Sequence, residues 1–592
     1  MSYLDPPRFS FSGQFWTNPS TINNATENYS LTEVYNNIPP SDVNPNSVWW
    51  NPQGQAFFKI TSGAVTSALD TTGCLVTTSA GDPLVGASIV SVPTGTVRVQ
   101  YARLVDLDPD QQARSMIVGM CIQIQIPGES GIALSGVLRP MLMLDVWGRV
   151  TGGGGGGIET AGAMFQTVID NPVWGTIGTT KSNLIKALYA ASPDTLSVKI
   201  VVDAYNGDPN SNAFNCGRIV GTIGPYLPGE PVSFVAKRKV FPPAPTPMNS
   251  APFELRGNTL TIDLGNSVPT TATNGGPFVD LGPITGAYKV NGDTTEIAIV
   301  PNVAAYTTQY TLTAGIFDIP LDANTAQQLA TNVLTIGINP PSASTSAVMG
   351  TTAGRLKENL PLSQTGATPV PVPAQPTTAL SENANGLYVD VTFNALRLEN
   401  GAPAWSAAAA ATGVEITSTA QVAFCATKFG APAAGVPINV TITPNQYQFR
   451  NDQGAFYNIN NTPMSAISWS PQSGETDSTG TLLVTFTAGP LSNSQKPARR
   501  QILDGQLYLF THQYAQRNSV QPITLLVFED SPAIVNPTWW DFVQPIFVQY
   551  ARVYPAMRDL IDLSDYASVT NSAFGIPAKI QGVLQLPMSD PA

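Results

Sequence analysis

Apolar and polar residues alternate with a period of two in many short segments of this chain, which is the pattern of half-buried β-strands. Turns rich in Gly, Ser and Asn separate these segments. The pattern predicts a mainly β protein built from several β-sandwich modules. The clearest alternating sets are Phe9/Phe11/Phe15, Val97/Val99/Tyr101, Ile122/Ile124/Ile126, Ile438/Val440/Ile442, Leu482/Val484/Phe486 and Ile523/Leu525/Val527.

Two proline-rich segments interrupt the strand pattern and predict domain boundaries, at Phe241–Pro247 and at Pro369–Pro376. Prolines cannot donate hydrogen bonds to a sheet and favour extended connectors. We therefore expect an N-terminal β-rich domain at 1–240, a second β domain at 250–365, an immunoglobulin-like β-sandwich at 385–533 and a helical segment at 537–592. The turn residues of Phe429–Pro437 and Thr476–Gly480 are similar to those of bacterial immunoglobulin-like domains.

Helical periodicity is strongest in Pro537–Tyr566, where apolar residues recur every three or four positions. Pro545 and Pro555 are expected to kink this helix. Its apolar side needs a partner, so we expect a partner-binding surface there. A shorter helix is expected at Thr180–Ala191. The predicted partner-binding residues are Phe542, Ile546, Tyr550, Val553, Met557 and Leu560.

Charged residues form only 11% of the 592 residues, and 40 acidic against 28 basic side chains give a net charge of −12. The longest basic run is Lys237-Arg238-Lys239, so nucleic acid and anionic membranes are not expected partners. A surface with few charges offers little electrostatic repulsion to copies of itself. We therefore expect self-association.

The N-terminus, Met1–Arg8, lacks the basic region and the apolar core of a secretion signal, and no apolar run has the length of a membrane span. Synthesis in the cytoplasm is the expectation, with the final location left open.

Two features are candidates for catalytic or cofactor sites. His512 is the single histidine and lies in a predicted strand, and no G-x-S-x-G motif supplies a nucleophile, so a hydrogen-bonded or surface histidine is expected rather than a general base. Gly152–Gly157 satisfies a phosphate-loop pattern, but six consecutive glycines satisfy any glycine pattern and no βαβ run surrounds them. We expect a loop there, and no cofactor.

Two further features could bind ligands. Asp106, Asp108 and Asp110 begin like a calcium loop, but Gln111 and Ile117 stand where its glycine and bidentate glutamate belong. They are weak calcium candidates, and a solvated turn is the main expectation. The paired tryptophans Trp49-Trp50 and Trp539-Trp540 could stack on sugars, although buried anchors are the commoner role.

Several stretches resemble the N-terminal, β-rich region of the violacein and indolocarbazole iminophenylpyruvate-dimer (chromopyrrolate) synthases and their relatives. These short motifs are spread over nearly the whole chain. They are Leu4-Asp5-x-Pro7-Arg8-x-x-Phe11-x-Gly13, Ala102-Arg103-x-Val105-Asp106-x-Asp108-Pro109, Leu264–Thr270, Tyr554-Pro555-x-Met557 and Leu563–Tyr566.

In that family a ferritin-like helical domain follows the β-rich region and carries metal chemistry. The resemblance implies that this chain ends before that domain. A di-metal helical site needs repeated Glu-x-x-His pairs, and the single His512 has no Glu three residues before it. No catalytic residue is therefore transferred from the family, and catalysis is not expected.

These observations together predict a non-catalytic structural or binding protein that self-associates through low-charge β surfaces. Two alternatives stay open. One is an accessory scaffold that docks a separate ferritin-like oxidative enzyme of bisindole-type biosynthesis. The other is a carbohydrate-binding or toxin-like surface protein.

Overall fold

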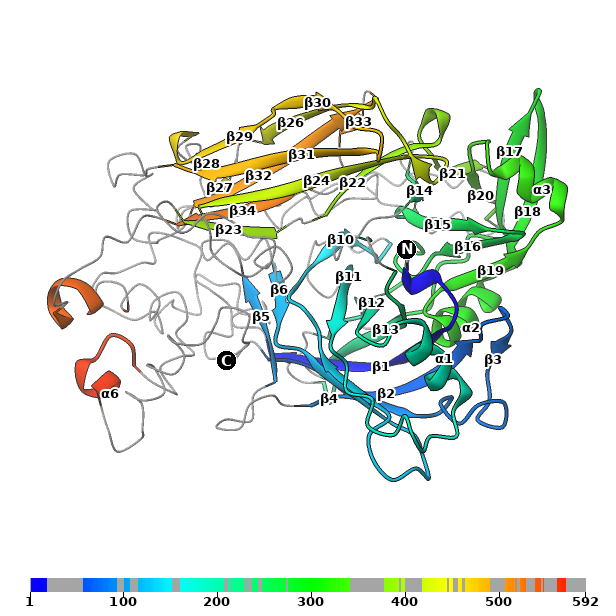
Figure 1. The fold of residues 1–592 in the computed structure, drawn as a ribbon, viewed down its shortest axis with the longest axis horizontal. Helices are drawn as coiled ribbons and strands as arrows, with labels where there is room; N and C mark the ends of the chain where they lie inside the picture. Colours follow the sequence, from blue (N-terminus) through cyan, green and yellow to red (C-terminus); the bar gives the residue numbers. More distant parts are fainter. Residues whose placement is uncertain are drawn as a thin grey trace.

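Strands dominate the computed structural model, which confirms a mainly β chain with several sheets (Figure 1). The model describes residues 2–18, 57–92, 101–106, 115–151, 160–206, 211–213, 216–227, 230, 237–242, 247–272, 275–340, 377–392, 395–399, 418–443, 447–450, 456–459, 464–489, 506–515, 517–518, 522–528, 538–544, 547 and 562–570.

The N-terminal part forms a 13-stranded sheet whose main path runs β10-β11-β12-β13-β1-β2-β4-β7-β8. Isolated bridges Ser135↔Val173 and Leu138↔Ile169 connect the β8 end to β11 and the loop after it, so the sheet curls round its own core. Its strands are β1 (Arg8–Asn18), β2 (Phe57–Leu69), β3 (Leu75–Val76), β4 (Ser88–Val92), β5 (Ala102–Asp106), β6 (Ser115–Val118), β7 (Cys121–Gln125), β8 (Leu134–Val137), β9 (Met141–Leu142), β10 (Leu144–Gly148), β11 (Ala161–Asp170), β12 (Thr195–Asp203) and β13 (Cys216–Pro225).

Aromatic residues of β1 fill this core because the neighbouring strand carries glycines opposite them. Phe11 pairs directly with Gly221, and Phe15 with Gly217. A Cβ atom at either glycine would overlap the phenylalanine ring, so the rings lie flat over the bare backbone of β13. The predicted alternation of β1 is confirmed, with Phe9, Phe11 and Phe15 all buried.

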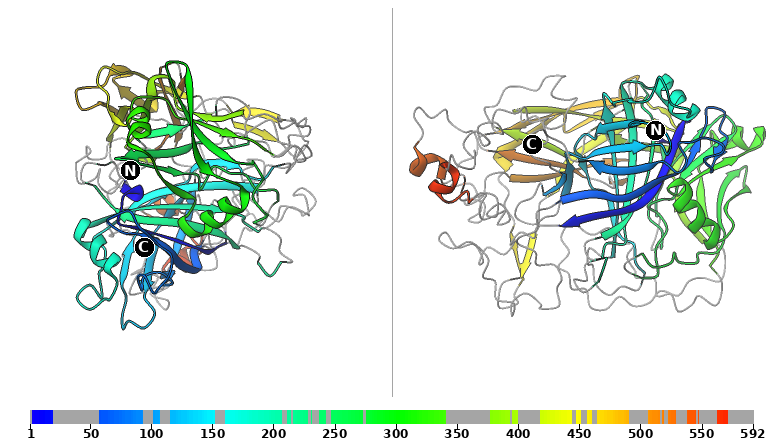
Figure 2. Two further views of the ribbon diagram at one scale, coloured as in Figure 1. Left: turned by 90° about the vertical axis from the view of Figure 1, so that its right-hand side faces the viewer. Right: turned by 90° about the horizontal axis from the view of Figure 1, so that it is seen from below.

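The next part of the chain forms two four-stranded sheets and two helices. Figures 1 and 2 show these elements, in green, at one end of the molecule beside the large sheet and the last sandwich. One sheet has the order β14-β15-β16-β19, and the other β18-β17-β20-β21. The elements are β14 (Arg238–Val240), β15 (Ala251–Arg256), β16 (Thr259–Asp263), β17 (Ile284–Val290), β18 (Asp293–Val300), α2 (Val303–Thr313), β19 (Ile316–Pro320), α3 (Ala323–Leu329), β20 (Thr335–Ile338) and β21 (Thr377–Ser381).

The last β region has two sheets that face each other, with the orders β22-β24-β31-β29 and β23-β34-β32-β26-β30. All pairings in both are antiparallel except that of β23 with β34. The strands are β22 (Leu387–Val391), β23 (Ala395–Glu399), β24 (Thr419–Lys428), β25 (Ala431–Pro432), β26 (Pro437–Thr443), β29 (Ile467–Ser470), β30 (Ser473–Glu475), β31 (Thr481–Ala488), β32 (Gln506–Tyr514), β33 (Arg517–Asn518) and β34 (Ile523–Phe528), with β27 (Tyr447–Arg450) and β28 (Phe456–Ile459) as a separate hairpin.

Further helical segments are described, among them the 3-10 helices η1 (Ser2–Leu4), η5 (Ala384–Gly386) and η6 (Met464–Ala466). The helix predicted at Thr180–Ala191 is present as α1 (Asn183–Ala191), with the Ser182 hydroxyl capping its N-terminus. Near the C-terminus the structure describes a π-helical turn, η8 (Trp539–Val543), and a short helix, α6 (Tyr566–Thr570). Most of the predicted Pro537–Tyr566 helix lies outside the described residues, so its kinked form stays a prediction.

Buried ion pairs join the large sheet to the β14-β15-β16-β19 sheet. The Nζ atom of Lys199 in β12 lies 2.9 Å from Oδ1 of Asp263 in β16, and both side chains are at most 2% exposed. In the same way Lys239 of β14 contacts Asp145 of β10 at 2.8 Å. A hydrophobic core cluster also runs across this junction, from Tyr3 and Val220 to residues of the second part. The predicted domain boundaries stay predictions.

A further buried pair connects β14 to the residue that directly follows β21 of the other four-stranded sheet. The guanidinium of Arg238 makes two bonds to the carboxylate of Glu382, of 2.9 and 2.6 Å, and also donates to the carbonyls of Leu329 and Asn332. Both charged side chains are 2% exposed. The basic run Lys237-Arg238-Lys239 is therefore mostly interior and gives no basic surface patch.

We predict that Glu382→Gln lowers the free energy of unfolding by about 3–5 kcal/mol, because it leaves the Arg238 guanidinium buried without its counter-charge. Lys237→Gln is the matched control, since Lys237 is 41% exposed and lies 3.7 Å from Glu254, and its effect should stay below about 1 kcal/mol. Urea unfolding of both variants measures this. Equal stabilities would contradict the role given to the buried pair.

Candidate functional site

The predicted metal and cofactor residues fall mainly outside the described residues. Asp106 ends β5 and pairs with Ser115 of β6, whereas Asp108, Asp110 and the glycines 152–157 are not described. In the described part of the chain, no group of three or more His, Cys, Asp or Glu side chains could hold a metal ion. The weak calcium hypothesis therefore stays a prediction.

The predicted partner-binding surface is described only at its start. Phe542 lies in η8, and Ile546, Tyr550, Val553, Met557 and Leu560 fall outside the described residues. The two tryptophans of the pair Trp539-Trp540 differ in packing and exposure. Trp539 packs edge-on against Phe547 and Tyr566, while Trp540 is 68% exposed. Trp49-Trp50 also lies outside the described residues.

His512 lies inside the last sandwich, where it is 3% exposed. Its ring stands edge-on to Phe424 at 5.2 Å and stacks on Tyr514 at 5.8 Å. Burial lowers the pKa of His512 to about 4, despite a backbone hydrogen bond with Val389 that acts in the opposite direction. A surface position is therefore wrong for this residue, and near neutral pH it is an uncharged core side chain.

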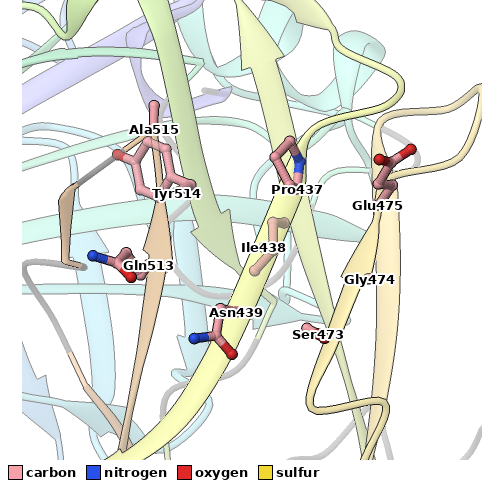
Figure 3. A pocket seen from close by; sticks show the side chains of 9 residues that line it. All are labelled: Pro437, Ile438, Asn439, Ser473, Gly474, Glu475, Gln513, Tyr514 and Ala515. Atoms are coloured by element: carbon pink, nitrogen blue, oxygen red, sulfur yellow. The ribbon is translucent and has the colours of Figure 1, made fainter.

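A groove lies on the outer face of the β23-β34-β32-β26-β30 sheet (Figure 3). Its volume is about 460 Å³. Asn439 of β26 pairs directly with Gln513 of β32 on one side and with Ser473 of β30 on the other. The groove is lined by Pro437, Ile438, Asn439, Ser473, Gly474, Glu475, Gln513, Tyr514 and Ala515.

The floor of this groove is formed by buried side chains, one of which is fixed by a hydrogen bond. Ile438 and Tyr514 point inward and are buried, and the Tyr514 hydroxyl accepts a hydrogen bond of 3.0 Å from the Asn383 amide. The exposed rim carries the polar Asn439, Ser473, Glu475 and Gln513 beside the apolar Pro437 and Ala515, and Glu475 is the one charged residue in the lining. Such a groove offers hydrogen bonds to a neutral ligand but has no nucleophile–base pair of the kind that covalent catalysis needs.

On the opposite sheet of the sandwich, the outward positions of β24, β31 and β29 carry no charges, and we call this surface the threonine face. Asp390 of the neighbouring strand β22 borders it beside Cys425 and is 8% exposed. The members of the threonine face alternate strictly with buried residues along β24 and β31. Leu483, at its centre, is 54% exposed. The threonine face consists of Thr419, Gln421, Ala423 and Cys425 of β24, Thr481, Leu483, Thr485 and Thr487 of β31, and Ser468 and Ser470 of β29.

A buried charge cluster lies where β10, β12 and β13 meet α2. The Oδ2 atom of Asp203 forms ion pairs with two guanidinium groups. It lies 2.8 Å from Nη1 of Arg149 and 2.6 Å from Nη2 of Arg218. Burial would raise the pKa of Asp203, but the two guanidinium groups outweigh it and hold the pKa below its usual value. Arg149 also donates to the carbonyls of Val268 and Gly265. Its bonds tie strands together, which is a structural role.

The comparisons with known proteins leave the function open. No family model matches the chain, and no curated protein matches it. Among solved structures, it is similar to a protein of unknown function from Porphyromonas gingivalis W83, with 7% identity, coverage of 47% of this chain and 95% of that one, and a TM-score of 0.14. A score this low supports no conclusion.

None of the helices in the described part of the chain combines the length and the apolar character that crossing a bilayer requires.

Stability should depend on pH through His512. An unfolded imidazole with the ordinary pKa of 6.5 takes up a proton before the buried one, whose pKa is about 4. The contribution of a neutral His512 is therefore complete above pH 6.5 and is lost as the pH falls from 6.5 towards 4. Between pH 7.5 and pH 5 the free energy of unfolding should fall by about 2 kcal/mol more in the native chain than in His512→Phe. Urea unfolding at both pH values tests this, and identical pH slopes would disprove it.

Proposed function

We propose that this chain is a non-catalytic structural or binding protein that associates with copies of itself through uncharged β surfaces. The observation that carries the proposal is the threonine face, where ten outward positions on three adjacent strands include no charged residue. Charged side chains on a protein surface ordinarily oppose association between copies of the protein. This surface lacks that protection.

The chemistry of the threonine face suits contact with a second copy. Hydroxyl and amide groups can donate and accept, so two identical faces can satisfy each other's hydrogen bonds. The exposed Leu483 supplies an apolar centre, and no like charges meet when the copies approach.

The size of the face sets the strength of the contact. A standard stable interface uses about 20–30 residues per partner, and the face supplies ten. We therefore expect a weak, concentration-dependent association unless other surfaces contribute to it.

The same proposal includes two structural details. The strand orders β22-β24-β31-β29 and β23-β34-β32-β26, with β23 parallel to the last strand, support an immunoglobulin-like sandwich. A kinked helical segment after residue 537 remains part of the proposal, as does synthesis in the cytoplasm.

A second candidate is the accessory scaffold that docks a separate ferritin-like oxidative enzyme, in keeping with the resemblance to the violacein-type synthases. The exposed rings of Trp540 and Tyr566, at 68% and 52%, favour it. Large exposed aromatic side chains are frequent anchors of protein interfaces.

Replacing the centre of the threonine face tests the self-association. Leu483→Lys brings two positive charges together in a symmetric contact, so we expect the dissociation constant to rise at least about tenfold. Thr441→Lys, on the outer face of the other sheet, should leave it unchanged. Light scattering over a concentration series measures both. A native chain that stays at its monomer mass of 62.5 kDa at every concentration would sink the proposal.

The scaffold candidate predicts co-purification of the chain with an oxidative enzyme encoded beside it. Trp540→Ala should reduce the recovered enzyme several-fold, because truncating an interface tryptophan costs about 2 kcal/mol or more. Tyr189→Ala, at an aromatic residue that is 41% exposed on α1, is the control. Recovery that does not change with Trp540→Ala would count against this surface.

A further inference from the structure

The rim of the groove between β26, β30 and β32 carries a row of hydrogen-bonding side chains. Gln513, Asn439 and Ser473 are direct cross-strand neighbours, so all three project from the same face. Figure 3 shows them across the three strands, with Glu475 beyond Ser473 on β30. Direct neighbours have Cβ atoms about 5 Å apart, so the row spans roughly 10 Å.

These polar groups have no partner among the residues that the structure describes. Within the described part of the chain, the side chains of Asn439, Ser473, Glu475 and Gln513 take part in no hydrogen bond or ion pair. The next row of the same face differs, because Thr441 and Thr511 lie 3.3 Å apart and bond to each other. The groove therefore offers two amides, a hydroxyl and a carboxylate to a ligand.

The lining also restricts the class of ligand. Its one charge is the negative Glu475 and no lysine or arginine lines it, which disfavours phosphates, nucleic acid and acidic glycans. Ile438 and Tyr514 are buried beneath the rim. Pro437 and Ala515 are exposed apolar side chains of the lining, which can contact the carbon-bound face of a sugar ring. Peptide strand addition at β26 is blocked, because among the described strands β26 pairs with β30 on one edge and with β32 on the other. A peptide strand could add only at the outer edge of β30, which is the end of the sheet.

We propose that this groove binds a neutral carbohydrate. Amides donate and accept at once, and a carboxylate accepts two bonds, which suits the adjacent hydroxyl groups of a sugar ring. A volume of about 460 Å³ falls in the range of small-ligand sites. Because the groove is open, a single sugar should bind weakly, and multivalent display should strengthen binding.

This site is separate from the threonine face, which lies on the opposite sheet. Sugar binding and self-association therefore rest on different residues, and each can fail without the other. The site also differs from the paired tryptophans considered as sugar platforms from the sequence.

The full chain should be tested on an array of neutral, sialylated and sulfated glycans. We expect it to bind neutral glycans in preference to the acidic ones. The affinity for the best neutral glycan should then be measured by titration for the native chain and the double variant Asn439→Ala/Gln513→Ala. A loss of at least about tenfold is expected, since two hydrogen bonds disappear.

Thr441→Ala is the matched control, because Thr441 lies on the same strand and face but outside the groove. Its affinity should stay within about twofold of the native value, and circular dichroism of each variant checks the fold. Binding of no neutral glycan, a preference for acidic glycans, or unchanged affinity in the double variant would each overturn the proposal. Light scattering on the same samples reports self-association independently.

Discussion

Buried ion pairs hold the sheets of this protein in place relative to one another. Lys199 with Asp263 and Lys239 with Asp145 cross from the large sheet to the β14-β15-β16-β19 sheet. Arg238 with Glu382 connects that sheet to the end of β21 in the other four-stranded sheet. A buried charge without its partner is costly, so these contacts strongly disfavour any arrangement that separates the pairs. The adjoining apolar cores supply the bulk of the burial.

The same ion pairs reduce the number of charged side chains on the surface. The chain has few charged residues, and several of them are buried in the interior. The exposed strands of the last sandwich consequently carry hydroxyl, amide and small apolar side chains where charges would ordinarily discourage contact. Its two outer faces divide into the flat threonine face and the polar groove of Asn439 and Gln513. Both the proposed self-association and the proposed sugar binding follow from that scarcity of charge.

Strands with one buried face could be predicted from the sequence, because alternation survives in β1, β7, β26 and β31, whereas β34 is buried on both faces. Helix α2 could not be predicted, because the many threonines of its segment favour a strand. It forms because Tyr306 and Tyr310, one turn apart, pack against Phe278. The ion pairs join residues distant in sequence, and the one available signal was a charge inside an apolar strand, as at Lys199. The groove could not be predicted from the sequence, because its residues are distant in the chain and the register between the strands brings them together.

The central claim is that uncharged β surfaces bring copies of this chain together. Sedimentation equilibrium of the native chain at about 0.05 and 0.5 M salt tests it directly, because added salt screens attraction between charges but not contact between neutral faces. The account predicts concentration-dependent association whose constant stays the same or rises with salt. Association that weakens markedly at the higher salt concentration would contradict it, as would a monomer at both.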